Sequence, residues 1–298
     1  MAQTKIYPGN PSDAQSLLAA VLKENQRTEP ERLRVVIDSL CRHLFDFALD
    51  TQLTYEELEL ALQFLNAVGK ETGPQKNEAI LLADVLGLST LVQLQDSHRV
   101  MQSGGTEPAL IGPFWRAHQP EKKSGDDIFS PDTPGVRMRI HGRVVDLQHQ
   151  PIAGAIVDVW QASPVGLYEN QDDSQPDQNL RGRFTTDAQG RFALRTVRPA
   201  GYPIPTDGPV GRLLDHQKRE AMRPAHVHFI AIAQGYRVLP TQIFDASDPH
   251  IENDVVFGAV GSLVKEFKPH PQHPDELLLE VELMLEPGET RIPHPPLD

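Results

Sequence analysis

Hydrophobic residues change their spacing part of the way along the chain. Up to Met101 they recur at every third or fourth position, which is the period of an amphipathic α-helix. Beyond residues 103–115, SGGTEPALIGPFW, they alternate with polar residues in short runs that glycine, proline and aspartate separate, as in β-strands. The pattern predicts an α+β fold, with an all-helical unit over residues 1–104 and a β-sandwich over residues 105–298.

Four segments of the first part have the helical period: residues 13–25, 29–49, 54–70 and 77–95. Thr54 and Glu57 stand in the T-x-x-E order of a capping box, which marks a helix start. The helices have more apolar surface than they can cover among themselves, and such surface is typical of an interface. We therefore expect a dimerisation and linker unit that forms a homodimer.

Seven alternating runs in the second part predict an antiparallel sandwich; they are residues 136–146, 155–162, 182–187, 190–197, 225–233, 237–245 and 277–285. Residues 141–162 and 185–197 together resemble the repeat of small transthyretin-like or carboxypeptidase-regulatory sandwich modules, many of which are not enzymes. A non-enzymatic binding module is therefore one hypothesis for this part of the chain.

Composition narrows the class of partner. The 41 acidic and 28 basic residues give a net charge of −13, which repels polyphosphates, so we expect no nucleic acid partner. No stretch approaches the roughly 18 apolar residues of a membrane span, and residues 1–10 lack the apolar core of a signal peptide. We expect a cytoplasmic protein. Cys41 is the single cysteine, so it cannot form an intramolecular disulfide.

Two histidines, His226 and His228, begin the apolar run RPAHVHFIAIA. Alternate residues of a strand share one face, so the two imidazoles lie about 7 Å apart at Cα and are able to bind one metal ion. A solvated strand face is the alternative for an isolated H-x-H, and a zinc hydrolase is another. Three further histidines, His270, His273 and His294, lie among prolines that lack the fixed geometry of a specific metal site, and indicate a surface extension.

Two of the five tyrosines, Tyr168 and Tyr202, lie in predicted loops where a side chain can reach over the end of a sheet. A phenol has a pKa of about 10, and a strongly acidic cation such as Fe(III) is needed to hold two phenolates at neutral pH. Zinc more often takes cysteine, histidine or carboxylate ligands. Two histidines and two tyrosines together therefore indicate ferric iron.

The order of these residues resembles the intradiol ring-cleavage dioxygenases. The matching motifs are W-x(7)-Y at 160–168, RPxxYPIPxDGP at 198–209, RPAHxH at 223–228 and TQIF at 241–244. ILLADVLGLSTLV in the first part, and TEPALIGPFW where the two parts join, are similar to the same family. The resemblance implies Fe(III) with Tyr168 and His226 as equatorial ligands, Tyr202 and His228 as axial ligands, and a hydroxide in the fifth place.

The resemblance also implies roles in the reaction of an aromatic diol with O2. Tyr202 accepts one of the two protons that the diol loses as it chelates the metal. Arg223 and Gln242 lie beside the substrate and stabilise the charge that develops during ring cleavage to a cis,cis-muconate. No other cofactor is required, and a lipid-like molecule such as a phospholipid is expected between the helices of the dimer.

Within the family, the segments around residues 80–89 and 254–267 are more similar to hydroxyquinol 1,2-dioxygenases than to the plain catechol branch. The resemblance places these residues around the aromatic ring: Leu81, Asp84, Leu110, Ile111, Gly112, Pro113, Phe114 and Val256. Asp84 can accept a hydrogen bond from a third ring hydroxyl, whereas catechol would leave its carboxylate unpaired. Ala83 and Trp115 depart from the hydroxyquinol pattern, so catechol and chlorocatechol stay open as alternative substrates, and a helix-surface Asp84 is the alternative to a pocket residue.

Overall fold

The computed structural model describes residues 13–73 and 76–295, and of Arg99 and Met101 it describes the backbone alone. The chain forms two compact units, Met1–Asn66 and Ala67–Asp298. The helices that follow residue 66 thus belong to the same unit as the β-strands, whereas the predicted boundary at residue 104 follows the change of hydrophobic period. Residues 1–10, which lack a signal-peptide pattern, lie outside the described residues.

The first unit contains α1 (Ala14–Asn25), α2 (Glu31–Asp50) and most of α3 (Tyr55–Glu71). α1 and α2 are joined by a hydrogen bond of 2.9 Å from Asn25 Nδ2 to Asp38 Oδ1. The expected capping box forms at the start of α3, where the N–H of Thr54 donates to Glu57 and the N–H of Glu57 donates to Thr54. No residue of α1 or α2 is buried, so their apolar side chains lack a core.

The predicted helix over residues 77–95 is two helices, α4 (Glu78–Val85) and α5 (Leu88–Ser103). Gly87, between them, has φ of +75°, a left-handed conformation that ends a helix at little cost only for glycine. The prediction of one helix was therefore wrong here. In the described residues, no single helix is long and apolar enough to cross a membrane, although Glu78–Val85 and Leu88–His98 reach that length and composition together across a 67° bend.

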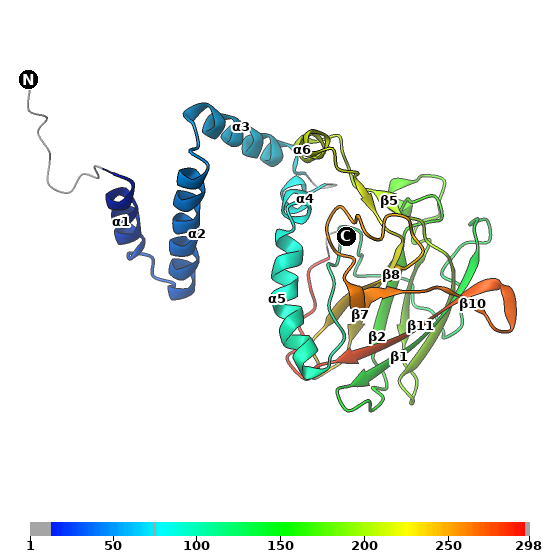
Figure 1. Cartoon of the computed structure of the whole chain (residues 1–298). Helices are drawn as coiled ribbons and strands as arrows, with labels where there is room; N and C mark the ends of the chain where they lie inside the picture. Colours follow the sequence, from blue (N-terminus) through cyan, green and yellow to red (C-terminus); the bar gives the residue numbers. More distant parts are fainter. Residues whose placement is uncertain (1–12, 74–75, 296–298) are drawn as a thin grey trace, which may run out of the picture. The chain divides into compact units, whose positions relative to one another are not determined.

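The second unit also contains two β-sheets (Figure 1). One has the order β10-β11-β1-β4 and the other β3-β2-β7-β8-β9. Their strands are β1 (Arg137–Asp146), β2 (Ile156–Gln161), β3 (Arg181–Thr185), β4 (Arg191–Val197), β7 (His226–Ile232), β8 (Leu239–Asp245), β9 (Val264–Lys265), β10 (Lys268–His270) and β11 (His273–Leu285). All seven predicted runs form strands, which confirms the predicted fold class.

Two features of the sandwich differ from the prediction. The β1–β11 and β8–β9 pairs are parallel, so both sheets are mixed, because alternation reports which face is buried and is blind to strand direction. A short ribbon, β5 (Tyr202–Pro203) with β6 (Met222–Arg223), and the helix α6 (Pro209–Gln217) are not among the predicted strands and helices, and Tyr202 lies on this ribbon where a loop is predicted. Two 3₁₀ turns, Glu169–Gln171 and Gly261–Leu263, complete the second unit.

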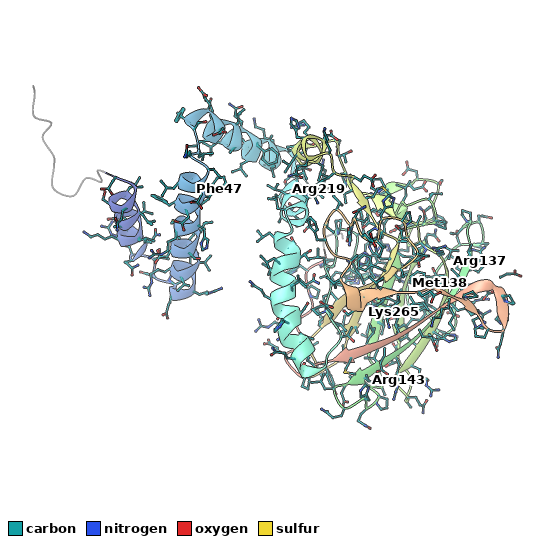
Figure 2. All side chains as sticks on the ribbon, in the orientation of Figure 1. Phe47, Arg137, Met138, Arg143, Arg219 and Lys265 are labelled. Atoms are coloured by element: carbon teal, nitrogen blue, oxygen red, sulfur yellow. The ribbon has the colours of Figure 1, made fainter. Side chains whose placement is uncertain are left out.

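The sandwich core lies between the two sheets. Met138 and Ile140 of β1 and Leu283 of β11 meet Val227 and Phe229 of β7, and all five are fully buried; Figure 2 labels Met138 on β1. Because successive strand residues point to opposite faces, the neighbours of the two β7 residues point out of this core. The outer face of the five-stranded sheet is therefore where the histidines of β7 lie.

Candidate metal centre

β7 presents His226 and His228 on the outer face of its sheet, between β2 and β8. The registers place Trp160 and Gln242 on either side of His228. Both histidines are almost fully buried, with 2% and 1% of their surface exposed. The solvated strand that an isolated H-x-H allows is therefore not what this sheet provides.

The two tyrosines approach from separate segments. Tyr168 precedes the 3₁₀ turn Glu169–Gln171, and its N–H donates to Gln171 Oε1 at 3.1 Å, which holds the backbone there. Tyr202 stands opposite Arg223 in the β5–β6 ribbon. Both rings are buried, and their centroids are 5.4 Å apart at an interplanar angle of 86°.

Donor atoms of these side chains converge on one point. His226 Nε2 lies 3.1 Å from His228 Nε2, which lies 3.2 Å from the hydroxyl of Tyr168. The ring of Tyr202 lies 5.5 Å from that of His226. The structure thus brings together all four residues that the sequence singles out as metal ligands.

The protonation of the histidines suits metal binding. His226 Nδ1 is 2.7 Å from the carbonyl oxygen of Pro224, which can only accept, so this nitrogen carries the proton and Nε2 keeps its lone pair. Burial, with the charge of Arg223, lowers the pKa of His226 to about 3. Burial, with His226 nearby, also lowers the pKa of His228 well below its usual value. Both imidazoles are neutral at pH 7.

Tyr168 shows what the site lacks on its own. Burial, together with the neighbouring hydroxyl of Tyr202, raises the pKa of Tyr168 well above its usual value. A phenolate at this place therefore requires a strong positive charge beside the oxygen, and the charge of Arg223 acts in that direction without reversing the shift. A highly charged cation would supply what is missing.

A cation fits the distances as well as the charges. Two atoms that each lie about 2.1 Å from one cation, in tetrahedral or more crowded coordination, are separated by about 3.0 to 3.4 Å. The two measured donor separations, 3.1 and 3.2 Å, lie in this range. Neutral nitrogens with phenolic oxygens form a hard, anionic donor set that matches Fe(III) better than zinc.

The surroundings fix the ring of His228. The indole of Trp160 stacks on it at 4.5 Å with an interplanar angle of 9°. On another side lies Gly112, which has φ of +74° and where an added Cβ would lie 3.3 Å from His228 Cε1. His228 Nδ1 is buried without a hydrogen-bond partner among the described residues, so packing rather than hydrogen bonding orients this ring.

Arg223 and Gln242 lie next to the donor atoms. Arg223 Nη1 is 3.5 Å from His226 Nε2, and Nη2 donates to Gln242 Oε1 at 3.1 Å. The amide nitrogen of Gln242 donates to the carbonyl oxygen of Leu110. A fixed guanidinium and a fixed amide thus border the point where the donors meet.

The carboxylate that balances Arg223 is Asp254, which sequence reasoning missed. Its two oxygens each lie 3.2 Å from a guanidinium nitrogen. Burial alone would lower the pKa of Arg223, but the carboxylate of Asp254 and the two tyrosines outweigh it and raise the pKa. Burial conversely opposes the ionisation of Asp254, yet Arg223 holds its pKa below the usual value. A buried arginine requires such a partner, and this requirement is the signal that could have pointed to it.

The expected pocket residues fall into three groups. Ile111 and Phe114 pack against the cluster of Trp115, Trp160 and the two tyrosines, and the ring of Phe114 stacks on Tyr168 at 4.3 Å. Leu81 and Val256 belong to a separate small apolar cluster with Val85 and Ile204. Pro113 is exposed in a turn, while Gly112 and Leu110 contact His228 and Gln242 as described.

Asp84 is half-buried near the end of α4. Burial raises its pKa, against a hydrogen bond with Ser89 and the charge of Arg223, both of which lower it. The carboxylate thus lies within electrostatic range of Arg223 and Asp254. This placement differs from that of a solvent-facing helix residue.

Other metal sites receive no support. Within the part of the chain that the structure describes, no group of three or more histidine, cysteine, aspartate or glutamate side chains could hold a metal ion. His270 and His273 face each other across the β10–β11 turn, with ring centroids 4.8 Å apart. The tyrosines are thus what completes a ligand set in this chain.

Comparison with known proteins covers both parts of the chain. A family model described as "Catechol dioxygenase N terminus" matches residues 30–104, and one described as "Dioxygenase" matches residues 110–286. The hydroxyquinol 1,2-dioxygenase of Rhizobium sp. (strain MTP-10005) is 40% identical over 249 residues, 83% of each chain. The catechol 1,2-dioxygenase of Candida albicans is 36% identical over 257 residues, 86% of this chain and 84% of the relative.

A solved structure agrees with these matches. The hydroxyquinol 1,2-dioxygenase from Pseudomonas putida DLL-E4 superimposes with a TM-score of 0.84 at 36% identity, covering 92% of this chain and 99% of that one. The similarity extends over the helical part as well as the sandwich, which a small transthyretin-like module does not account for. The chain is therefore an enzyme, and it belongs to the intradiol ring-cleavage dioxygenase family.

Proposed function

We propose that this chain binds ferric iron through Tyr168, Tyr202, His226 and His228 and cleaves hydroxyquinol with O2 between its two adjacent hydroxylated carbons. The observation that carries the proposal is the convergence of two neutral imidazole nitrogens and buried phenols on one point. When bound there, ferric iron supplies the Lewis acidity that draws a deprotonated diol and makes it reactive toward O2. The product is 3-hydroxy-cis,cis-muconate, or maleylacetate as its keto form.

Tyr202 is the proton acceptor of the proposed site. As a phenolate it would accept one of the two diol protons, and the hydroxide that the resemblance implies would accept the other. Two singly charged anions would then be exchanged for the two oxygens of the diol dianion, so that the buried site would keep its net charge. Tyr202 lies on the two-residue strand β5, and its ring contacts the rings of Tyr168 and His226.

Arg223 and Gln242 stabilise the negative charge that develops on oxygen as the ring opens. Arg223 directs Nη1 toward the donor atoms, and its charge is permanent. Preoriented donors in a site closed to water are worth far more than the same groups in solution.

Hydroxyquinol is proposed as the substrate because Asp84 is a half-buried carboxylate whose pKa is affected by the charges of Arg223 and Asp254. Its carboxylate can accept a hydrogen bond from the third hydroxyl of the ring, whereas catechol would leave it without a partner. Hydroxyquinol 1,2-dioxygenases and a catechol 1,2-dioxygenase are both among the similar proteins, so catechol is the second candidate.

Colour and iron content test the metal. The purified protein loaded with iron should contain about one iron per chain and absorb in the visible range through tyrosinate-to-iron charge transfer. A colourless, iron-free preparation that stays inactive after iron loading would contradict the proposal. A higher kcat/KM for catechol than for hydroxyquinol would contradict the proposed substrate and leave the proposed metal site unaffected.

The Tyr202→Phe variant tests the proton acceptor. We expect it to keep iron and to lose about 100- to 10,000-fold in kcat, the usual range for losing a general base. Full activity of this variant would refute the role of Tyr202.

A homodimer formed through the helical unit is also proposed, with a lipid-like molecule at the interface. The support is the row of half-exposed apolar residues on α2, namely Leu33, Leu40, Leu44 and Phe47, at helical spacing; Figure 2 labels Phe47. An exposed row of large apolar side chains is typical of an interface. Light scattering of the purified protein should give the mass of a dimer, and a monomer would remove this proposal.

A further inference from the structure

The three guanidinium nitrogens of Arg223 differ in their hydrogen-bond contacts. Nε donates to Asp254 Oδ1 and Nη2 donates to Asp254 Oδ2, each at 3.2 Å, in the fork geometry of an arginine–carboxylate pair. Nη2 also donates to Gln242 Oε1 at 3.1 Å. Among the described residues, the one hydrogen-bond contact of Nη1 is the long one of 3.5 Å to His226 Nε2. Nη1 is therefore the nitrogen that remains available for a substrate oxygen.

Asp254 is itself held in place by the loop that it begins. Its carboxylate accepts the N–H of Val256 at 3.3 Å and that of Gly258 at 2.9 Å. An added Cβ at Gly258 would lie 2.9 Å from Arg223 Nη2, so this loop leaves room for the guanidinium only as glycine. The loop thus packs closely around the Nε–Nη2 edge of the Arg223 guanidinium.

Two further residues tie the loop to the rest of the unit. Thr90 of α5 donates to the carbonyl oxygen of Val256 at 2.8 Å. Arg219 donates to the carbonyl oxygens of Val85 at 2.8 Å and Val255 at 2.7 Å, and Figure 2 shows Arg219 at the end of α6 beside α4. The backbone that follows Asp254 is thus held by Thr90 of α5 and by Arg219, which fixes the place of the carboxylate in the fold.

We propose that Asp254 is a positioning residue for ring cleavage. It holds the Nε–Nη2 edge of the Arg223 guanidinium so that Nη1 points at the reacting oxygen. The inference rests on the proposed function and goes beyond it, because Asp254 itself has no contact with the four donor residues among the hydrogen bonds described. Because Asp254 acts through Arg223, its loss should lower turnover by weakening the stabilisation of the transition state, and iron binding should stay unchanged.

The Asp254→Asn variant of the iron-loaded enzyme gives the first test. The amide keeps the size of the side chain, but only its oxygen accepts hydrogen bonds, so it cannot pair with both Nε and Nη2 as the two carboxylate oxygens do. The Nε–Nη2 edge of Arg223 is then no longer held in place. We expect kcat to fall by about 10- to 100-fold, as for a misplaced catalytic group, while iron content and the charge-transfer band stay as in the wild type. An unchanged kcat would overturn the proposal.

A double-mutant cycle with Arg223→Gln separates positioning from general structure. Arg223→Gln alone should lose about 100- to 1,000-fold in kcat, as on removing one donor to the developing charge. If Asp254 acts through Arg223, the variant carrying both substitutions loses no more than Arg223→Gln alone. Losses that multiply would overturn the proposal. The double variant also removes both buried charges, so it folds even where one substitution leaves a charge unpaired.

Asp254→Glu and Asp245→Asn serve as matched variants. Asp254→Glu keeps the charge but moves it by one methylene, so kcat should fall by about 10-fold with normal folding. The buried carboxylate of Asp245 forms an ion pair with the partly exposed Arg198 at 2.7 Å, and among the described hydrogen bonds its side chain has none to the four donor residues. Asp245→Asn should lower the unfolding temperature and leave kcat unchanged. A colourless, inactive wild type would reject the proposed function, whereas an active wild type with an equally active Asp254→Asn variant would reject this inference alone.

Discussion

The two faces of strand β7 carry different kinds of structure. Val227 and Phe229 point into the core between the sheets, where apolar volume alone is required. His226 and His228, on the opposite face, are just as buried but lie among polar atoms, with the carbonyl oxygen of Pro224 2.7 Å from His226 Nδ1 and the two Nε2 atoms 3.1 Å apart. The same strand thus builds stability on one face and chemistry on the other, and the difference teaches that burial by itself does not distinguish them.

The largest effect is expected from a substitution on the outer face of β7, which carries the two histidines. His226→Ala should reduce iron content from about one per chain to near zero and turnover by at least about 1,000-fold, because the ligand set loses a nitrogen. The fold should stay intact, since a neutral imidazole contributes little to the sandwich. Metal analysis and the visible absorbance check this result, with His141→Ala, at an exposed position of β1, as the control. Stoichiometric iron in His226→Ala would remove His226 from the ligand set.

On the inner face the expected effect is on stability. Phe229→Ala should lower the free energy of unfolding of the metal-free protein by about 3 to 5 kcal/mol, the cost of a large cavity in a packed core. The fraction that remains folded should still bind iron. Urea unfolding followed by fluorescence measures the first quantity and metal analysis the second. If Phe229→Ala lost its iron while still folded, the two faces would not be independent.

A smaller effect is expected at Gly112, which lies against the outer face. Gly112→Ala adds a methyl group 3.3 Å from His228 Cε1, so iron affinity should fall by about 10-fold, as for other residues that orient a ligand. The left-handed backbone adds about 1 to 2 kcal/mol of strain. Gly154 has the same φ of +74° but no atom within 4 Å of an added Cβ, so Gly154→Ala should show the strain without the loss of iron affinity. Equal iron affinity in the two variants would contradict the role of Gly112.

Much of this division could be predicted from the sequence, since a period of two fixes which residues share a face. The alternation of β7 separates Val227 from His226 and His228 with no further information. The chemistry of the side chains pointed to Tyr168 and Tyr202, because two phenols beside two imidazoles form a suitable ligand set only for a strongly acidic cation.

Other features depend on contacts that hydrophobic periodicity does not describe. The helix break at Gly87 comes from one backbone angle inside an uninterrupted apolar pattern. Asp254 lies 31 residues from Arg223 along the chain, and only the folded loop brings the two together. The parallel pairing of β1 with β11 joins strands whose order in space is independent of their alternation.

That last pairing has a consequence for biosynthesis. β11 lies between β10 and β1 in its sheet and contributes Leu279, Val281, Leu283 and Leu285 to the core, yet it leaves the ribosome after every other strand. Until then β1 has β4 as its sole partner, and one side of the inter-sheet core stays open to water. Because parallel pairing between distant segments is slow, the nascent sandwich waits with an unpaired edge, and this interval is when the chain is most exposed to aggregation and most dependent on chaperones.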